Sequence, residues 1–242
     1  MDKRFLIIVA AIIVVVGGIF WFSRPSKSTP GSNGAQPSNH VMGGGSKNVT
    51  LVEYGDFQCP ACGAYYPVVK QVVSSYQDQI FFQFRNFPLT QIHQNAFAGA
   101  RAAEAAAKQN KYWEMHDKLY EGQQDWTGSS NPFNIFKGYA TDLKLDTNKF
   151  QSDYQSQAVN DVINADIAVG QKIPVTATPT FILDGVKVEN NPQSVDAFMK
   201  LIQDAIVKKN PGDSGAPTSA APASSTDASG APLPAATPAG GQ

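Results

Sequence analysis

The chain has 242 residues, a formal net charge of −1 and 42% hydrophobic residues. This balance argues against nucleic acid or an acidic membrane surface as a charge-driven partner. The two cysteines, Cys59 and Cys62, lie in one CxxC motif, so no disulfide can form elsewhere in the chain. The fold must therefore be held together by packing.

Residues 5–22 form an uncharged apolar run preceded by Lys3 and Arg4. A helix of this length rises about 27 Å, close to the thickness of a bilayer's hydrocarbon layer. The alternative is the core of a cleaved signal peptide, which is usually shorter and ends in a small-residue cleavage site. This run ends at Trp21 and Phe22 without such a site, so residues 1–22 are predicted to be an uncleaved transmembrane anchor.

Two polar segments flank a body of ordinary domain size. Residues 23–47 are rich in Ser, Gly, Pro and Asn and predict a flexible linker. Residues 211–242 are rich in Pro, Ala, Ser and Thr and predict a disordered tail, either a stalk or an unstructured solubilising end. The folded domain is predicted to span residues 48–210.

The body begins with a strand, a helix and a second strand. Residues 48–54 are β-branched and apolar, which predicts a buried strand, and residues 60–75 repeat apolar side chains at helical spacing. Residues 80–87 predict another strand, closed by Pro88. This order predicts a right-handed crossover between two parallel strands.

A helical insertion is predicted over about residues 92–171, with helical patterns at 95–109, 111–121, 134–143 and 146–170. Strand patterns return at 179–183 and 186–188, separated by Asp184-Gly185, a strong hairpin signal. Residues 194–208 close the domain as an amphipathic helix. The predicted order is βαβ, a helical insertion, then ββα.

The CxxC motif falls where the first strand meets a helix. Pro60 suits the first helical position, where a missing N–H has no consequence. Unpaired N–H groups of that first turn favour a thiolate at Cys59, the better nucleophile and leaving group. Cys62, one turn later, faces the core and can bond to Cys59 to release a mixed-disulfide partner. The motif predicts a redox-active dithiol.

Other interpretations of the motif are weaker. A tetrahedral zinc site needs four ligands, and the three histidines are poorly placed, with His40 in the linker and His93 and His116 in the helical region. These two later histidines are expected to pack or lie at the surface. A structural disulfide closing so small a loop would constrain the unfolded chain little. No metal or nucleotide cofactor is expected.

A Thr178-Pro179 step stands at the start of a later predicted strand. It is either an ordinary edge proline or a cis proline. The CxxC motif upstream favours the second interpretation.

With these motifs in place, the sequence resembles the DsbA-like thiol-disulfide oxidoreductases, of the exported or membrane-anchored bacterial branch. The resemblance covers roughly residues 47–208 and is carried by residues 52–62, 85–89, 112–119 and 177–181. It implies an α/β fold, thioredoxin-like with an inserted helical domain, here preceded by the predicted transmembrane helix.

The resemblance also implies roles for single residues. Cys59 is the attacking, solvent-facing thiol and Cys62 its buried partner. Pro179 is the cis proline that faces the disulfide. Thr178 offers backbone groups to an extended substrate segment, a strand-addition mode.

Three further positions are expected to modulate the redox pair. Glu53 matches a buried acid that relays a proton to or from Cys62, although a solvent-facing glutamate at the strand end is equally compatible. Pro60 and Ala61 lie between the cysteines. Because many strongly oxidising relatives have histidine where Ala61 stands, their oxidising strength does not carry over.

The predicted function is an oxidase that donates its Cys59–Cys62 disulfide to exported cysteine-containing proteins. The resemblance suggests a quinone-linked membrane protein that reoxidises the pair. The domain is expected outside the cytoplasm, in the periplasm or at the cell exterior, tethered to the cell membrane, because cytosolic thiol systems would keep it reduced. The alternatives are a reductase or isomerase of exported cysteine proteins, or a non-catalytic surface binding module.

Overall fold

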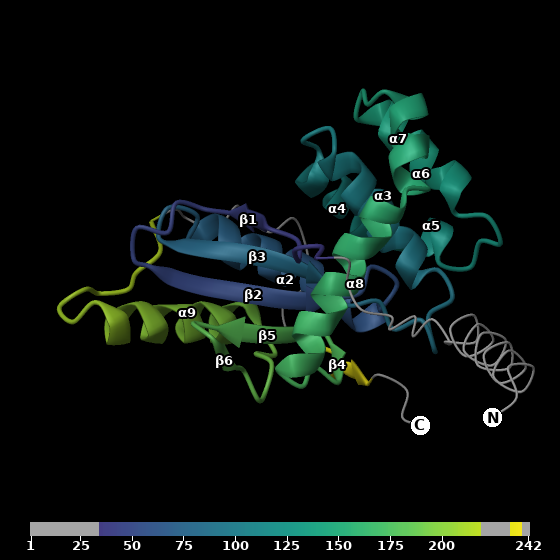
Figure 1. Ribbon diagram of the computed structural model, residues 1–242. Helices are drawn as coiled ribbons and strands as arrows, with labels where there is room; N and C mark the ends of the chain where they lie inside the picture. Colours follow the sequence, from purple (N-terminus) through teal and green to yellow (C-terminus); the bar gives the residue numbers. More distant parts are fainter. Residues whose placement is uncertain (1–33, 219–232, 239–242) are drawn as a thin grey trace, which may run out of the picture. The chain divides into compact units, whose positions relative to one another are not determined.

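The computed structural model describes residues 34–218 and 233–238 (Figure 1). Its main sheet has the strand order β1-β3-β2-β5-β6, and β4 pairs with β7 in a separate two-stranded sheet. The strands are β1 His40–Met42, β2 Val49–Gly55, β3 Ile80–Asn86, β4 Ala177–Thr178, β5 Thr180–Leu183, β6 Val186–Lys187 and β7 Thr237–Pro238. The predicted membrane anchor, residues 1–22, lies outside the described residues.

The strand pairing confirms the predicted βαβ and ββα halves. Strands β2 and β3 are parallel and are joined by α2 (Pro60–Ser75), while β5 is antiparallel to both β2 and β6. At the β5–β6 turn, φ is 49° at Asp184 and 80° at Gly185. Positive φ at both central residues is what a type I′ hairpin turn requires, which explains the Asp-Gly pair.

The insertion and the closing helix also follow the predicted order. The helices are α3 Ala96–Ala107, α4 Tyr112–Glu121, α5 Gln123–Trp126, α6 Phe133–Asp142, α7 Thr147–Tyr154, α8 Gln157–Lys172 and α9 Val195–Lys209. The helical stretch predicted at residues 146–170 is in fact divided into α7 and α8. Between them, Ser156 has extended backbone and its hydroxyl accepts a hydrogen bond from the Val159 N–H, which begins a new helix.

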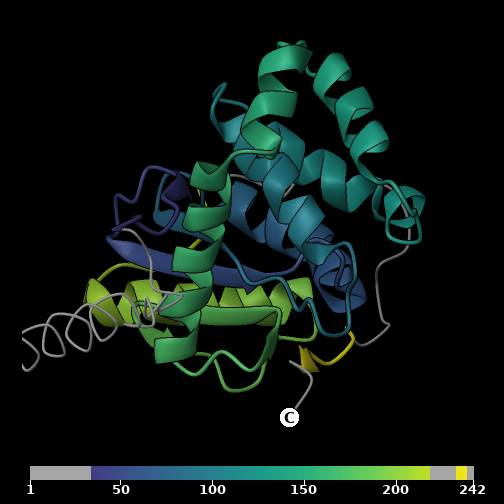
Figure 2. The ribbon, with the colours of Figure 1, turned by 45° about the vertical axis from the view of Figure 1, so that its right-hand side comes forward.

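Helices cover both faces of the sheet (Figures 1 and 2). On one face, α2 and α9 bury a cluster that includes Leu51 of β2 and Phe82 of β3. On the other face, Tyr54 and Ile182 pack with Ile167 of α8. Both faces of β2 are therefore buried, which accounts for its nearly continuous apolar sequence.

The helical insertion builds a core of its own that reaches the CxxC motif. Trp126 of α5, Phe136 of α6 and Phe150 of α7 are fully buried in this cluster. The same cluster contains Cys59 and Cys62. The insertion therefore forms one wall around the two cysteines.

The end of the predicted linker is part of the fold, which corrects the prediction of a flexible segment through residue 47. Residues 40–42 form β1, antiparallel to the edge of β3, with His40 opposite Phe84. Ser38 is buried, and its N–H and hydroxyl donate to the Asp166 carboxylate at 2.9 and 2.7 Å. A polar segment cannot build a core, but it can satisfy a sheet edge and a buried carboxylate.

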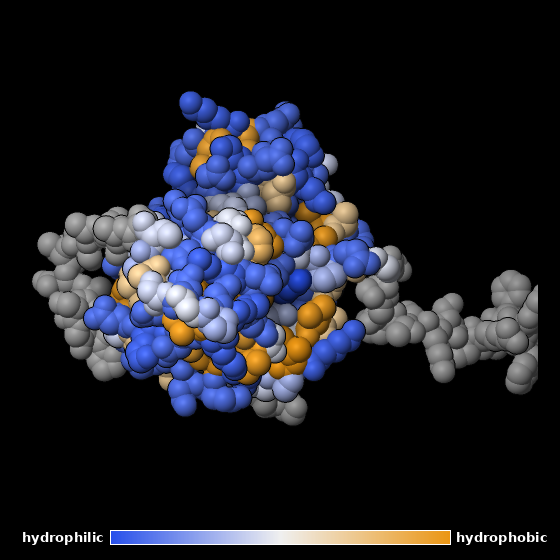
Figure 3. Space-filling view, turned by 90° about the vertical axis from the view of Figure 1, so that its left-hand side faces the viewer, coloured by the Kyte–Doolittle hydropathy of each residue, from blue (hydrophilic) through white to orange (hydrophobic). Residues whose placement is uncertain are grey.

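The face shown in Figure 3 is mainly hydrophilic, with apolar residues in small separate groups. Large exposed apolar side chains among the described residues are Val41, Ile92, Val186 and Val207. Within residues 34–218 and 233–238, no helix is long and apolar enough to span a bilayer.

Asp166 provides a test of how firmly the segment before β2 is bound. Its fully buried carboxylate also accepts from the Arg85 guanidinium at 3.0 Å and from the Asn86 N–H at 3.1 Å. Asp166→Ala leaves these donors unpaired and is expected to lower the free energy of unfolding by about 3–5 kcal/mol. Urea unfolding measures the change.

The matched control is Asp161→Ala, at a less buried aspartate of the same helix that accepts only from the Gln157 side chain. This variant should change the unfolding free energy by no more than about 0.5 kcal/mol. Equal effects of the two substitutions would contradict a structural role for the Ser38–Asp166 contact.

Candidate active site

Cys59 is the residue immediately before α2, with φ −64° and ψ 122°, and Pro60 is the first helical residue. The predicted placement of the motif at a helix start is therefore confirmed. Both cysteines are buried thiols in this structure. Because Cys59 immediately precedes α2, its sulfur lies at the positive end of the helix dipole.

The cis-proline loop meets the CxxC motif from the far end of the sequence. The Thr178–Pro179 peptide bond is cis, as the resemblance implied. The Cys59 thiol donates to the Thr178 carbonyl oxygen at 3.4 Å. The two motifs, separated by the whole helical insertion, therefore form one site.

The two sulfurs have opposite acid–base character. The pKa of Cys59 is lowered to about 5, and a hydrogen bond from the Cys62 thiol is the largest cause. The Thr178 and Thr237 side chains and the Cys62 backbone lower the pKa further, while burial opposes the shift. Burial, and then the bond to Cys59, raise the pKa of Cys62 well above its ordinary value. At neutral pH, the reduced site holds a thiolate at Cys59 and a thiol at Cys62.

The Thr178 hydroxyl is buried and has no hydrogen-bond partner within the described part of the chain. It contributes to the lowered pKa of Cys59. Because an unpaired buried hydroxyl is unfavourable, this hydroxyl is expected to donate to the Cys59 sulfur when that sulfur is a thiolate.

Glu53 is buried, 3% exposed, so the structure supports the buried acid over the solvent-facing glutamate. Residues on a strand alternate between faces, so Glu53 shares the α2-facing side of β2 with Val49 and Leu51. Burial, and then the negative charge of Cys59, raise the Glu53 pKa to about 8. The carboxyl group is therefore protonated at neutral pH.

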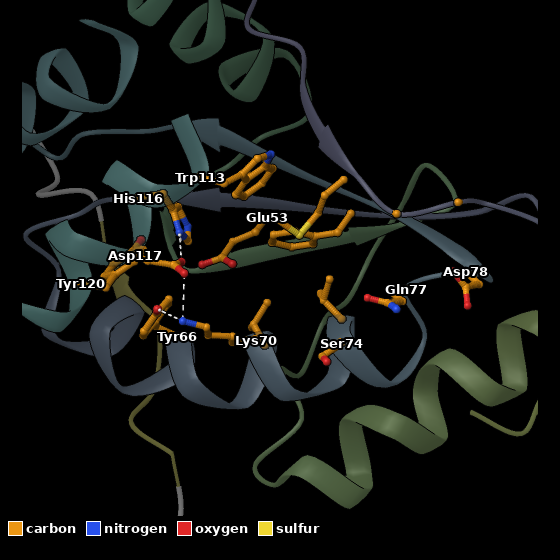
Figure 4. Close-up of a pocket in the computed structure, with 16 residues that line it drawn as sticks. Glu53, Tyr66, Lys70, Ser74, Gln77, Asp78, Trp113, His116, Asp117 and Tyr120 are labelled. Atoms are coloured by element: carbon orange, nitrogen blue, oxygen red, sulfur yellow. Dashed lines mark hydrogen bonds and ion pairs between the residues drawn. The ribbon is translucent and has the colours of Figure 1, made fainter. Parts of the chain in front are cut away.

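A cavity of about 520 Å³ lies between α2, α4 and β1, and Glu53 lines it (Figure 4). Its walls are mainly apolar and include Tyr66 of α2 and Trp113 of α4, while Lys70 and Asp117 form an ion pair across it at 2.8 Å. The cavity is large enough to hold water.

Asp56 organises the loop that presents Cys59, and the sequence analysis did not single it out. Its buried carboxylate accepts from the Gln58 N–H at 2.8 Å and the Leu89 N–H at 2.9 Å, and pairs with His93 Nδ1 at 2.7 Å. The bond to Asp56 raises the His93 pKa, and the charge of Cys59 adds to this shift. His93, expected to be a packing or surface residue, therefore lies in the electrostatic field of the site.

Gln123 of α5 holds the same loop from the insertion. Its side-chain amide donates to the carbonyl oxygens of Phe57 at 2.7 Å and Cys59 at 3.0 Å. A Cβ atom at Gly63 would lie 2.4 Å from the Gln123 Oε1 atom, so this helical position has to be glycine for the amide to fit. No sequence signal connects Gln123 with the motif.

The other histidines fit packing roles. His116 is buried beside the rings of Phe57, Phe84 and Tyr120, and burial lowers its pKa. His40 Nε2 lies 2.8 Å from the Glu104 carboxylate. In the described ranges, no three His, Cys, Asp or Glu side chains are grouped to hold a metal ion.

Part of the predicted disordered tail reaches the site, which corrects that prediction. Residues 237–238 form β7, antiparallel to β4, with Thr237 opposite Thr178. The Cys59 thiol donates to the Thr237 hydroxyl oxygen at 3.1 Å. A Pro- and Ala-rich segment cannot build a core, yet its extended backbone can pair with an open strand edge.

The family model described as Thioredoxin matches residues 35–204, most of the described body. The chain belongs to the thioredoxin family. This membership agrees with the sheet order, the CxxC position and the cis proline described above.

Among curated proteins, the Na(+)/H(+) antiporter NhaA 3 of Salinispora tropica is 34% identical over 167 residues, 69% of this chain and 24% of the antiporter. The chain thus spans about a quarter of the length of such relatives. The probable disulfide bond formation protein D of Bacillus anthracis is 28% identical over 185 residues, 72% of this chain and 83% of that protein.

Two solved structures illustrate the fold of this thioredoxin-family chain. A thioredoxin-like oxidoreductase from Silicibacter pomeroyi is 26% identical with a TM-score of 0.56, covering 70% of this chain and 90% of the other. BdbD from Bacillus subtilis, 22% identical, shares the fold with a TM-score of 0.61, covering 71% and 96%. The resemblance to DsbA-like thiol-disulfide oxidoreductases is confirmed.

The Cys59 pKa can be measured from thiolate absorbance or from the alkylation rate as a function of pH. The midpoint is expected at about pH 5, and Cys62→Ala should raise it because the Cys62 thiol is the largest stabilising donor. The lowered pKa stabilises the reduced fold fully above about pH 8.5, the value for an unfolded cysteine, and this contribution is lost as the pH falls to about 5.

Cys59→Ala, which removes the titrating thiolate, supplies the baseline for the absorbance measurement. A midpoint near 8.5 in the unsubstituted protein would show that the contacts around Cys59 do not stabilise its thiolate.

Proposed function

We propose that this chain donates its Cys59–Cys62 disulfide to cysteine-containing proteins outside the cytoplasm. The observation that carries the proposal is the contrast between the two thiols, with the pKa of Cys59 lowered to about 5 and that of Cys62 raised. A fold that stabilises the Cys59 thiolate stabilises the reduced state, and a stabilised reduced state makes the disulfide a better oxidant.

The reaction proceeds by two thiol–disulfide exchanges. A substrate thiolate attacks the Cys59 sulfur of the oxidised enzyme, forming a mixed disulfide, and Cys62 leaves and takes up a proton. The second substrate thiolate then attacks the substrate sulfur of that mixed disulfide. Cys59 leaves as a stabilised thiolate, so the substrate loses two electrons and the enzyme gains them.

The substrate site is proposed to lie along β4, where the carbonyl oxygen of Thr178 contacts the Cys59 thiol next to the cis Thr178–Pro179 bond. An extended segment can add to this short strand through backbone hydrogen bonds, which places a cysteine against the Cys59 sulfur. Such pairing is largely independent of side chains, so it suits an enzyme that acts on several unfolded substrates.

Ala61 limits how oxidising the pair can be, because it contributes no positive charge beside Cys59. The Cys59 pKa of about 5 lies between roughly 7 for thioredoxin and roughly 3.5 for DsbA. One pKa unit corresponds to about 30 mV for this two-electron couple. A Cys59 pKa about two units below that of thioredoxin raises the expected potential from thioredoxin's −270 mV to about −210 mV.

Equilibration of the purified chain in glutathione buffers measures the reduction potential. A value of about −210 mV, well above that of thioredoxin, is expected and supports a disulfide donor. A value at or below about −270 mV would instead assign the chain to the reductases of exported cysteine proteins. The Cys59→Ala variant controls for reaction of glutathione with Cys62.

The location of the domain is part of the proposal. Residues 1–22 are proposed to anchor the chain in the cell membrane, with the catalytic domain in the periplasm or at the cell exterior. An oxidising compartment is needed because cytosolic thiol systems would reduce the pair. The anchor would also keep the enzyme beside a quinone-linked membrane protein, the proposed source of oxidising equivalents.

Glu53 is proposed to supply the proton that Cys62 takes up as it leaves. Glu53→Gln should slow oxidation of a reduced model protein at least about tenfold near pH 7, because general acid catalysis is lost. Because burial raises the Glu53 pKa above its ordinary value of 4.5, the unsubstituted rate should also show an inflection above that value that the variant lacks. Stopped-flow kinetics over pH 6–9 measure both.

Glu114→Gln is the matched control, at an exposed α4 glutamate paired with Lys111. This substitution should leave the rate and its pH profile unchanged. A Glu53→Gln enzyme with an unaltered inflection would remove Glu53 from the proton pathway and leave it a packing role.

A further inference from the structure

The edge of β4 beside the active site is already occupied by the chain's own C-terminal segment. Strand β7 pairs antiparallel with β4, placing Thr237 opposite Thr178 and Pro238 opposite Ala177. Figures 1 and 2 both show β7 beside β4. A single strand at this edge leaves no room for a second, because each strand edge pairs with one partner.

Contacts outside the strand hold the segment in place. Leu233 packs against the apolar cluster of the sheet, α2 and α9. Ala235 and Ala236 line a hollow of about 410 Å³ together with Tyr65 and Pro179. The segment from 233 to 238 therefore follows the border of the active site.

Thr237 places a hydroxyl group next to the Cys59 sulfur. Its hydroxyl oxygen lies 3.1 Å from the Cys59 sulfur. A threonine hydroxyl branches from Cβ as a cysteine thiol does, but it cannot form a disulfide. With β7 in place, Cys59 is 0% exposed, although its reaction with a substrate thiolate requires access.

We infer that residues 233–238 are an intramolecular pseudo-substrate, a strand that binds the substrate site with Thr237 where a substrate cysteine reacts. The segment competes with substrates and shields the Cys59 thiolate from small oxidants and alkylating reagents. This inference rests on the proposed function, because it identifies β4 as the place where substrates bind.

The segment also indicates which substrates fit. Two alanines precede Thr237, and they border Tyr65 and Pro179 without filling the hollow. An extended segment with small residues before its cysteine should bind in the same register. The preferred partner is thus an unfolded chain of this kind, which displaces the tail when it enters.

A disulfide trap tests the register directly. In a Cys62→Ala background, Thr237→Cys places a thiol where the hydroxyl now meets the Cys59 sulfur. Exchange with oxidised glutathione then forms a bond between Cys59 and position 237 and releases two molecules of reduced glutathione. Mass spectrometry of the intact chain and of its peptides measures the linked fraction.

Ala236→Cys in the same background is the matched control, since Ala236 precedes β7 and lines the hollow beside Tyr65 and Pro179. The linked fraction at position 237 should correspond to an equilibrium constant at least about tenfold larger than at position 236, a difference of about 1.4 kcal/mol. Equal equilibrium constants at the two positions would show that the tail reaches Cys59 only as a flexible tether, which would overturn the inferred binding mode.

The shielding is measured with the cysteines intact. Leu233→Asp removes the apolar contact of the segment and should raise the iodoacetamide alkylation rate of Cys59 about tenfold at pH 7, by the usual magnitude of a lost leucine contact. Val186→Asp, at a 70% exposed valine on β6, should leave the rate unchanged. An unchanged rate in both variants would contradict shielding.

The two proposals can fail separately. An enzyme that oxidises a reduced protein but shows no preference for position 237 retains the proposed function and loses the pseudo-substrate strand. If the position 237 disulfide forms preferentially but the reduction potential lies at or below that of thioredoxin, the pseudo-substrate strand is supported and the oxidase function is not.

Discussion

The opposite acid–base character of two buried sulfurs within one helical turn is the constraint on which the chemistry of this protein depends. Cys62 faces the core and stays protonated, so its thiol can stabilise the Cys59 thiolate at the start of α2. Neither property belongs to the CxxC motif itself. Each follows from the packing of α2 against the sheet on one side and the helical insertion on the other.

The surroundings of Cys59 are contributed by distant parts of the chain. Asp56 orders the preceding loop, Gln123 of the insertion binds its carbonyl oxygens, and Thr178 borders the sulfur from the cis-proline loop. The insertion is thus a structural support of the site as well as a cover. Ala61 supplies no charge, so hydrogen bonds from the Cys62 thiol and from the Thr178 and Thr237 side chains, together with the helix terminus, carry the stabilisation of the thiolate.

The low-complexity ends of the described body were the least predictable parts. The composition of residues 23–47 and 211–242 indicates that these segments cannot build a core of their own. Composition does not show that β1 pairs with the edge of β3 and that β7 pairs with the edge of β4. Backbone pairing needs no apolar side chain, so a pattern based on hydrophobic periodicity does not detect it.

The sequence by itself determined the βαβ and ββα order, the hairpin at Asp184-Gly185 and the position of the CxxC motif at a helix start, because local periodicity and motif spacing encode them. For Glu53, both faces of β2 are apolar, so alternation could not distinguish burial from exposure. Only the tertiary structure decided that Glu53 is buried beside a cavity and that Thr237 reaches Cys59. Both are contacts between segments far apart in the chain, and such contacts depend on how complete elements pack.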